Sequence, residues 1–148
     1  MLEIIKMQDT DREIVMKMVE DFYQSPAVSH PVPTKVLLRT FEDAVSGTQG
    51  LDGYKLQEDG RIIGFSYITE FYACEMGGKC IMLEEIYLSE AARGKGYATQ
   101  FFNWLFEKYS YAKRFRLEVS KDNAGVVGLY ERLGFKFLDY GQMVRDVL

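Results

Sequence analysis

Two glycines and two basic residues lie close together between an apolar run and a segment with helical spacing. Residues 83–88 are mostly apolar, and Arg93-Gly94-Lys95-Gly96 follows a few residues later. Glycine lets the backbone approach a ligand closely, and the first turn of a helix carries amide groups without intrahelical partners. The helix dipole and the side chains of Arg93 and Lys95 add positive charge at the same place. This arrangement predicts an anion site for a phosphate or a pyrophosphate.

Two adjacent carboxylates, Glu84 and Glu85, lie within the apolar run. Side chains of a strand alternate between the two faces of a sheet, so we expect one carboxylate on each face. Burial would raise the pKa of one of them towards that of a useful general base. Both side chains could instead be structural, one on the solvent face and one paired with a basic residue.

The composition is that of one soluble globular domain spanning residues 1–148. Hydrophobic residues make up 47% of the chain, and the formal net charge of −4 disfavours a general nucleic-acid binder. No segment predicts a signal peptide or a membrane span, so we expect a cytoplasmic protein that does not bind membranes. The single histidine and two separated cysteines make no recognisable zinc set. Cys74 and Cys80 flank a predicted turn, and two free cysteines are favoured over a hairpin disulfide.

Hydrophobic spacing and turn signals predict an α/β (α+β) fold with helices on a mostly antiparallel sheet. Helices are predicted at about 11–24, 34–46 and 123–133, the last ended by Gly134. A further helix after the glycine turn is predicted from the helical spacing of Phe101, Phe102, Leu105, Phe106 and Tyr109. Strands are predicted at 2–6, 53–57, 61–71, 80–88 and 114–120, with one or two more in 135–147 that close the sheet.

Two motifs give the chain a family resemblance. The segment Arg93-Gly-Lys-Gly96-Tyr-Ala98 resembles the Arg/Gln-x-x-Gly-x-Gly/Ala signature of the GNAT superfamily of N-acetyltransferases. The segment 123–135, with Asn123, Leu-Tyr130 and Gly-Phe, is similar to the second motif of that family. The resemblance implies a mixed, mostly antiparallel sheet of six or seven strands flanked by about four helices.

The resemblance also implies a binding site for acetyl-coenzyme A. The pyrophosphate would bind the backbone amides of the glycine turn, and the pantetheine arm would pair with the preceding strand near Ile86 and Leu88. Asn123 would cap its helix or contact the pantetheine arm. Tyr130 would be the general acid for the departing thiolate, although its helical stripe also suits a core tyrosine. The turn residues implied are Arg93, Gly94, Lys95, Gly96, Tyr97 and Ala98.

The implied reaction is direct attack of a primary amine on acetyl-CoA in a ternary complex, without a metal. Glu84 is favoured over Glu85 as the base because Glu84 matches the position that often carries glutamate in similar sequences. A small-molecule acceptor is favoured over a protein or peptide, and a non-catalytic coenzyme A sensor is a third possibility. A C-terminal strand could pair across a homodimer. The acceptor site would lie near the two N-terminal helices, with walls from Phe22, Tyr23, His30, Phe71 and Tyr72.

Overall fold

A computed structural model of the chain describes residues 1–147. The strands are β1 (Leu2–Lys6), β2 (Leu51–Glu58), β3 (Arg61–Ala73), β4 (Gly78–Leu88) and β5 (Arg114–Leu117). The helices are α1 (Arg12–Tyr23), α2 (Thr34–Ser46), α3 (Tyr97–Lys108) and α4 (Ala124–Arg132). Two short 3-10 turns, η1 (Asp9–Asp11) and η2 (Glu90–Ala92), precede α1 and α3.

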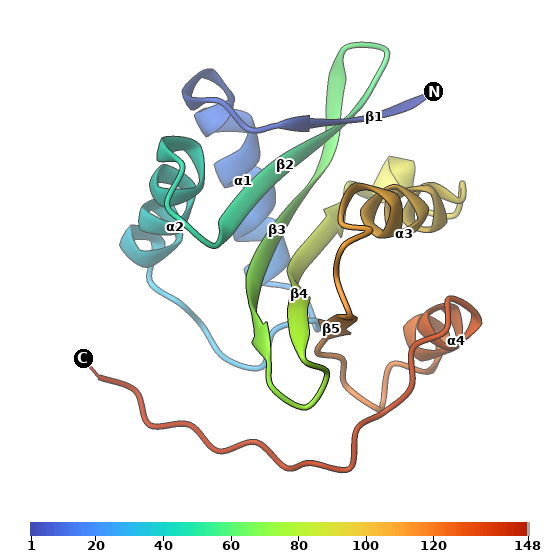
Figure 1. The fold of residues 1–148 in the computed structure, drawn as a ribbon. Coiled ribbons are helices and arrows are strands. Elements are labelled where there is room, and N and C mark those ends of the chain that lie inside the picture. Colours follow the sequence, from blue (N-terminus) through green and yellow to red (C-terminus); the bar gives the residue numbers. More distant parts are fainter. Residues whose placement is uncertain (148) are drawn as a thin grey trace.

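One mixed sheet forms the centre of the molecule, in the order β1-β2-β3-β4-β5 (Figure 1). The first four strands are antiparallel, and β5 is parallel to β4. The predicted Asp-Gly hairpin between β2 and β3 is confirmed, because Asp59 and Gly60 both have positive φ. Such turns match the twist of the strands that they connect.

Helices cover both faces of this sheet and enclose two apolar clusters (Figure 1). One cluster lies under α1 and α2 and contains Phe41, Phe65 and Tyr67. The other lies under α3 and contains Phe101 and Phe102, with Tyr130 of α4 packed against it. The helical spacing of the apolar residues therefore places α1 and α2 on one face of the sheet and α3 and α4 on the other.

The prediction of one or two strands in residues 135–147 is wrong, since the structure describes no strand there and its sheet has five strands instead of six or seven. Phe135 packs on Phe102 and Tyr130, but the chain then leaves the sheet. Tyr140 donates a hydrogen bond to Glu75 in the β3–β4 turn, 3.1 Å away. The segment thus passes beside the β3–β4 turn instead of running along β5. The strand predicted at 114–120 likewise ends earlier, at Leu117.

The helices described within residues 1–147 include none with the length and apolar character needed to cross a membrane. Cys74 is exposed, Cys80 is buried, and both are free thiols, as the sequence favoured.

Candidate active site

The glycine turn joins β4 to α3 through η2. Gly94 and Gly96 have φ values of 75° and 80°, a region that favours glycine, and Gly96 is the N-cap of α3. A Cβ atom at either position would meet no other atom within 4 Å, so the backbone angle, not crowding, requires glycine. Within the described chain, no group accepts a hydrogen bond from the amides of residues 94–99. The turn therefore presents a row of free donors at the positive end of a helix.

The two basic side chains of the turn lie differently. Arg93 turns back towards β4, where its Nε donates to the backbone oxygen of Leu88 at 2.9 Å. Its guanidinium also lies over the ring of Tyr87, 5.5 Å from the ring centre. Lys95 is exposed. Arg93 thus fixes the turn to the end of β4, while Lys95 is free to contribute charge to a ligand.

The second half of β4 separates from β5. The two strands pair only as far as Leu83 and Leu117, so in the described chain residues 84–88 have no strand partner on that side. At the same point the β3–β4 register shifts, because Tyr67 pairs with Glu85 while Ile68 pairs with Leu83. Glu84 is the extra residue of this β-bulge. The backbone around Ile86 is therefore open to an added extended chain, whereas the Leu88 oxygen already accepts from Arg93.

Glu85 is a half-buried carboxylate in this separated half of β4. The hydroxyl of Tyr23, the last residue of α1, donates to Glu85 Oε2 at 2.5 Å. The other oxygen, Oε1, is buried and has no hydrogen-bond partner among the described residues. Burial raises the pKa of Glu85 to about 7, the Tyr23 hydrogen bond opposes this rise, and the nearby Glu84 charge adds to it. Glu85 therefore changes its protonation state near neutral pH.

Tyr67 lies directly opposite Glu85 on β3, with its side chain in the cluster under α1 and α2. Its side chain is 2% exposed, and its hydroxyl also lacks a hydrogen-bond partner within residues 1–147. Gly53 makes room for the ring, because a Cβ there would lie 3.3 Å from Tyr67 Cε1 and closer still to Met7 and Ala44. Burial raises the pKa of the Tyr67 and Tyr23 phenols, so both stay protonated at neutral pH. Sequence reasoning missed Tyr67, since its position in β3 fits an ordinary core residue.

Glu84 lies in a different environment from Glu85. Its side chain is exposed, and its Oε2 accepts a hydrogen bond from Thr69 at 2.8 Å. The desolvation that we expected of one glutamate is thus found at Glu85.

The structure brings only part of the predicted acceptor wall to Glu85. Tyr23 contacts it, and Phe22 packs in the same cluster. His30 is exposed in the loop between α1 and α2, where it contacts Ser29. Phe71 and Tyr72 pair with Cys80 and Lys79 at the start of β4, about 16–20 Å along the strand from Glu85 at the usual rise per residue.

Tyr130 is half-buried on α4, where its ring packs edge-on against Phe102 and Phe135. Burial raises the pKa of its phenol, so the hydroxyl keeps its proton at neutral pH. Asn123 is the N-cap residue of α4, but its side chain makes no capping hydrogen bond. The capping role is therefore not used, and the amide of Asn123 is available to a ligand. Among the described residues, no group of three or more His, Cys, Asp and Glu side chains could hold a metal ion.

Comparisons with known proteins agree with this architecture. The family described as acetyltransferase (GNAT) matches residues 15–135, most of the chain. A search of curated proteins found no match. Fold and family together define an acyl-transferring α/β domain, and the chain belongs to the acetyltransferase (GNAT) family.

Solved structures show the same fold at low sequence identity. A possible acetyltransferase from Clostridium difficile 630 is 17% identical, with a TM-score of 0.85 over 99% of this chain and 98% of that one. The aminoglycoside N-acetyltransferase AAC(6')-Iy in complex with CoA is 18% identical, with a TM-score of 0.77 over 99% and 95%. A ribosomal-protein-alanine N-acetyltransferase from Brucella melitensis biovar Abortus 2308 is 18% identical, with a TM-score of 0.76 over 99% and 100%.

Proposed function

We propose that this acetyltransferase moves the acetyl group of acetyl-CoA to the primary amine of a small molecule, by direct attack in a ternary complex. The observation that carries the proposal is Glu85, a desolvated carboxylate in the half of β4 that has no partner on the β5 side. A base with a pKa near 7 suits proton transfer at neutral pH.

The donor site combines the glycine turn with the open strand. The free amides of residues 94–99 suit the pyrophosphate, and Lys95 adds charge. The backbone near Ile86 suits the amide groups of the pantetheine arm, which would add to β4 as an extra strand. Tyr97 and Ala98 act through their backbone amides, since the Tyr97 side chain is buried in the core. Acetyl-CoA supplies an activated thioester.

Glu85 and Tyr67 provide the acceptor end of the site. A primary alkylammonium has a pKa near 10, so it must lose a proton before it can attack. Glu85 Oε1 is the acceptor for that proton, and Tyr67 Oη is a second buried polar atom that needs a partner. Tyr23 holds the carboxylate in place through Oε2. The attacking nitrogen, or one water in contact with it, would satisfy both orphaned oxygens.

Tyr130 is the proton donor on the leaving-group side. As the C–N bond forms and the C–S bond breaks, the sulfur leaves as a thiolate and takes a proton from the Tyr130 hydroxyl. Before the attack, Glu85 passes the first proton of the ammonium to solvent, and as the C–N bond forms it accepts the second proton from the nitrogen. Solvent then carries this second proton from Glu85 to the Tyr130 phenolate, which restores both side chains. The raised pKa of Tyr130 keeps the required proton in place at neutral pH.

The charge of the site favours a cationic acceptor. Glu84 is exposed at the bulge next to Glu85, and the chain carries a formal net charge of −4. An exposed carboxylate near the base would attract a second positive group of a small polyamine-like or aminoglycoside-like molecule. A protein N-terminus or a lysine side chain has less charge to offer this carboxylate.

The test is release of free thiol from acetyl-CoA with a panel of polyamines, amino acids, aminoglycosides and peptides. We expect turnover with a small polycationic amine, and loss of most of it in Glu85→Gln and Tyr130→Phe with acetyl-CoA binding unchanged. Faster acetylation of peptides than of every small amine would overturn the acceptor class. Binding of acetyl-CoA without thiol release on any amine would indicate a coenzyme A sensor, and no thermal shift with acetyl-CoA would refute the donor site.

A further inference from the structure

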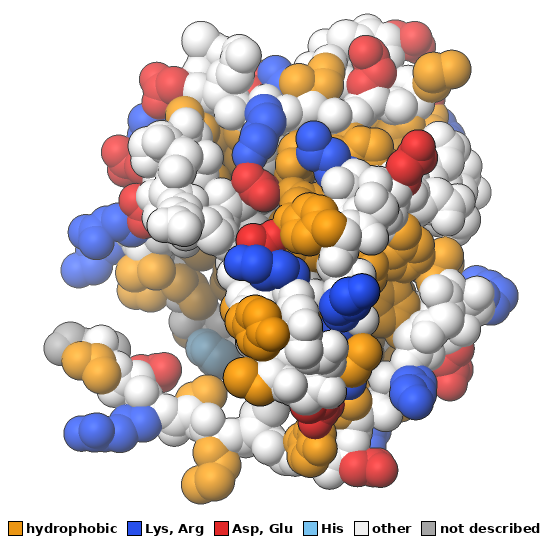
Figure 2. Space-filling view, in the orientation of Figure 1, with side chains coloured by type: hydrophobic (Ala, Val, Ile, Leu, Met, Phe, Trp, Pro, Cys, Tyr) orange, Lys and Arg blue, Asp and Glu red, His pale blue; other side chains and the backbone are white. Residues whose placement is uncertain are grey.

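Ser66 is a polar residue buried in an apolar part of the sheet. On the face of the molecule shown in Figure 2, Lys, Arg, Asp and Glu side chains are spread over the surface, as is usual for charged groups. Tyrosines aside, Asp11 and Ser66 are the only buried polar or charged residues of the described chain, and Asp11 forms an ion pair with Lys55. Ser66, which is 0% exposed, lies instead between Tyr54 on β2 and Ile86 on β4, in the apolar cluster under α3. Because a buried hydroxyl costs free energy unless it forms a hydrogen bond, its partner indicates its role.

The partner of Ser66 is the backbone of the bulge in β4. Ser66 Oγ donates a hydrogen bond to the carbonyl oxygen of Glu85 at 2.8 Å. That oxygen belongs to the peptide unit that joins Glu85 to Ile86, and in a planar trans peptide the C=O and N–H groups point in opposite directions. Because the Glu85 oxygen points towards β3, the Ile86 N–H points to the side on which this half of β4 has no strand partner in the described chain.

The other backbone groups at this end of β4 agree with that direction. The amide of Ser89 donates to the Ile63 oxygen of β3 at 2.8 Å, and the Leu88 oxygen accepts from Arg93, which is not in β3. The backbone groups of successive residues in a strand face its two neighbours in turn, so Ile86 and Leu88 both face the open side. The Ile86 N–H is therefore the open-side donor that lies next to the bulge and its buried carboxylate.

We propose that Ser66 is a positioning residue, which aims and polarises the Ile86 N–H as the hydrogen-bond donor to the carbonyl oxygen of the acetyl group. The proposal rests on the donor site proposed above. As the amine attacks and the C–N bond forms, an electron pair of the C=O bond moves onto this oxygen. A backbone N–H that is already in place stabilises the developing negative charge. The Ile86 oxygen and the Leu88 N–H remain for the amides of the pantetheine arm.

The Ser66 hydroxyl acts on this peptide unit in two ways. Its hydrogen bond fixes the orientation of the peptide plane at a bulge, where the ladder of backbone hydrogen bonds is irregular. A donor at the carbonyl oxygen also makes the N–H of the same peptide unit a stronger donor, and such cooperative strengthening is about 10–30% per bond. Alanine would suit the apolar surroundings of position 66 but could do neither.

The first test is difference infrared spectroscopy of acetyl-CoA, isotopically labelled at the thioester carbonyl and bound to the full chain without an acceptor. The carbonyl band should lie at lower frequency in the bound state than in solution. In Ser66→Ala it should return by about 10–30% of that shift, and in Ser66→Cys by less, because a thiol is a weaker donor of similar size. Thr69→Val is the matched control, since it removes a hydroxyl that bonds the Glu84 side chain at the same bulge. An unchanged band in Ser66→Ala, or an equal change in Thr69→Val, would overturn the proposal.

The second test is kinetic and separates this role from the acid–base chemistry of Glu85. Ser66→Ala should lower kcat about tenfold, because the donor is weakened and not removed, while KM for acetyl-CoA and the pH dependence set by Glu85 stay unchanged. A higher KM for acetyl-CoA with an unchanged kcat would mean that Ser66 only supports the strand, and would overturn the proposal. If Ser66→Ala behaves as expected but Glu85→Gln keeps the natural pH dependence, the base assignment fails and the role of Ser66 stands. No binding of acetyl-CoA by the natural chain would refute both.

Discussion

Replacement of Glu85 by glutamine tests the acid–base chemistry most directly. The carboxylate has a pKa of about 7 because burial outweighs the hydrogen bond from Tyr23. The reacting pair is ionised Glu85 and a protonated amine. Because the ionised fraction of Glu85 rises about tenfold per pH unit below 7, kcat/KM should rise by the same factor there and level off above pH 7. Glu85→Gln should lower kcat/KM by about 10²–10⁴-fold and remove this bend.

The assay is thiol release from acetyl-CoA between pH 5.5 and 8.5 with the best acceptor of the amine panel. Glu84→Gln is the matched control, because it makes the same change at the adjacent, exposed residue of the bulge. It should keep the bend but move it to somewhat lower pH, because the Glu84 charge no longer helps to raise the pKa of Glu85, and it should raise KM for a cationic acceptor more than it lowers kcat. A profile that Glu84→Gln flattens while Glu85→Gln leaves it intact would refute our assignment and restore Glu84 as the base.

The same pKa has a consequence for stability that needs no acceptor. The folded-state pKa of Glu85 is raised from 4.5 to about 7, so the folded chain binds more protons than the unfolded chain between these pH values. The free energy of unfolding should therefore fall as pH rises through this window, by at most about 3 kcal/mol from this group. Urea unfolding at pH 5 and pH 7.5 should show a smaller difference in Glu85→Gln than in the natural chain. An equal difference in both would mean that Glu85 is not desolvated.

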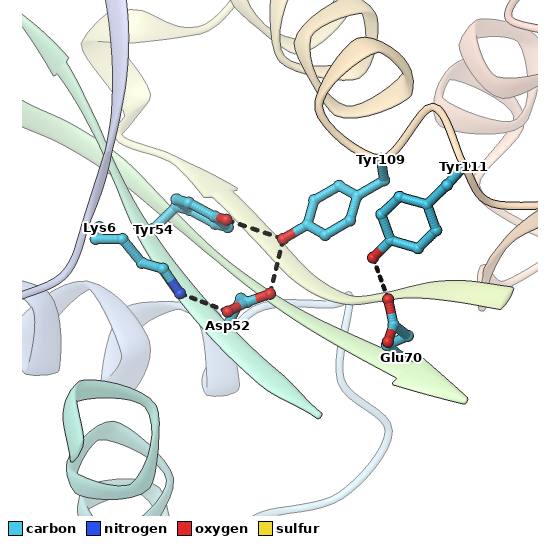
Figure 3. Close-up of polar contacts among 6 residues, drawn as sticks. All are labelled: Lys6, Asp52, Tyr54, Glu70, Tyr109 and Tyr111. Carbon is cyan, nitrogen blue, oxygen red and sulfur yellow. Dashed lines mark hydrogen bonds and ion pairs between the residues drawn. The ribbon is translucent and has the colours of Figure 1, made fainter. Parts of the chain in front are cut away.

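Three further predictions follow from local geometry. Tyr23→Phe removes the hydrogen bond that lowers the pKa of Glu85, so the bend of the pH–rate profile should move to higher pH. Because Gly94 has a φ of 75°, Gly94→Ala should lower the free energy of unfolding by about 1–2 kcal/mol and weaken acetyl-CoA binding in calorimetry. Gly128→Ala, inside α4, should instead raise the free energy of unfolding by up to about 1 kcal/mol. Tyr109→Phe should lower stability in urea unfolding by about 1–3 kcal/mol, because the buried Tyr109 hydroxyl bonds Asp52 and Tyr54 (Figure 3). Lys6 pairs with the same Asp52. Tyr111→Phe is the control: it removes an exposed contact with Glu70 and should change the free energy of unfolding by less than about 0.5 kcal/mol.

Most of the fold follows from local patterns in the sequence. Sequence patterns located α1, α2 and α4 to within one residue and indicated α3 from the spacing of its apolar residues, and Asp59-Gly60 located the first hairpin. The C-terminal segment could not be predicted in the same way. Residues 135–147 are rich in strand formers, but in the structure they form no strand, and their contact between Tyr140 and Glu75 joins residues that lie far apart in the sequence.

The glycine turn was more predictable from the sequence than the surroundings of Glu85. The glycine turn is a continuous stretch whose backbone angles and helix start are encoded locally. The environment of Glu85 is made instead by Tyr23 from α1 and Tyr67 from β3, which only tertiary structure brings together. No pattern in the sequence indicates that the Tyr67 hydroxyl is buried without a hydrogen-bond partner among the described residues.

The bulge at Glu84 explains why simple alternation did not identify the base. Leu83 packs in the cluster under α3, and in a regular strand Glu85, two residues on, would lie on that same face. The extra residue shifts the alternation of side chains by one position. Glu85 therefore faces Tyr67 and Tyr23 on the α1 side, and Ile86 lies on the α3 side. The pairing between β4 and β5 stops at this same residue. The bulge therefore decides which of the two carboxylates is buried beside Tyr67 and Tyr23, and it lies next to the point at which β4 loses its partner on the β5 side. If the same sequence formed a regular strand, Glu85 would lie on the α3 face with Leu83, and Glu84 would lie on the α1 face instead.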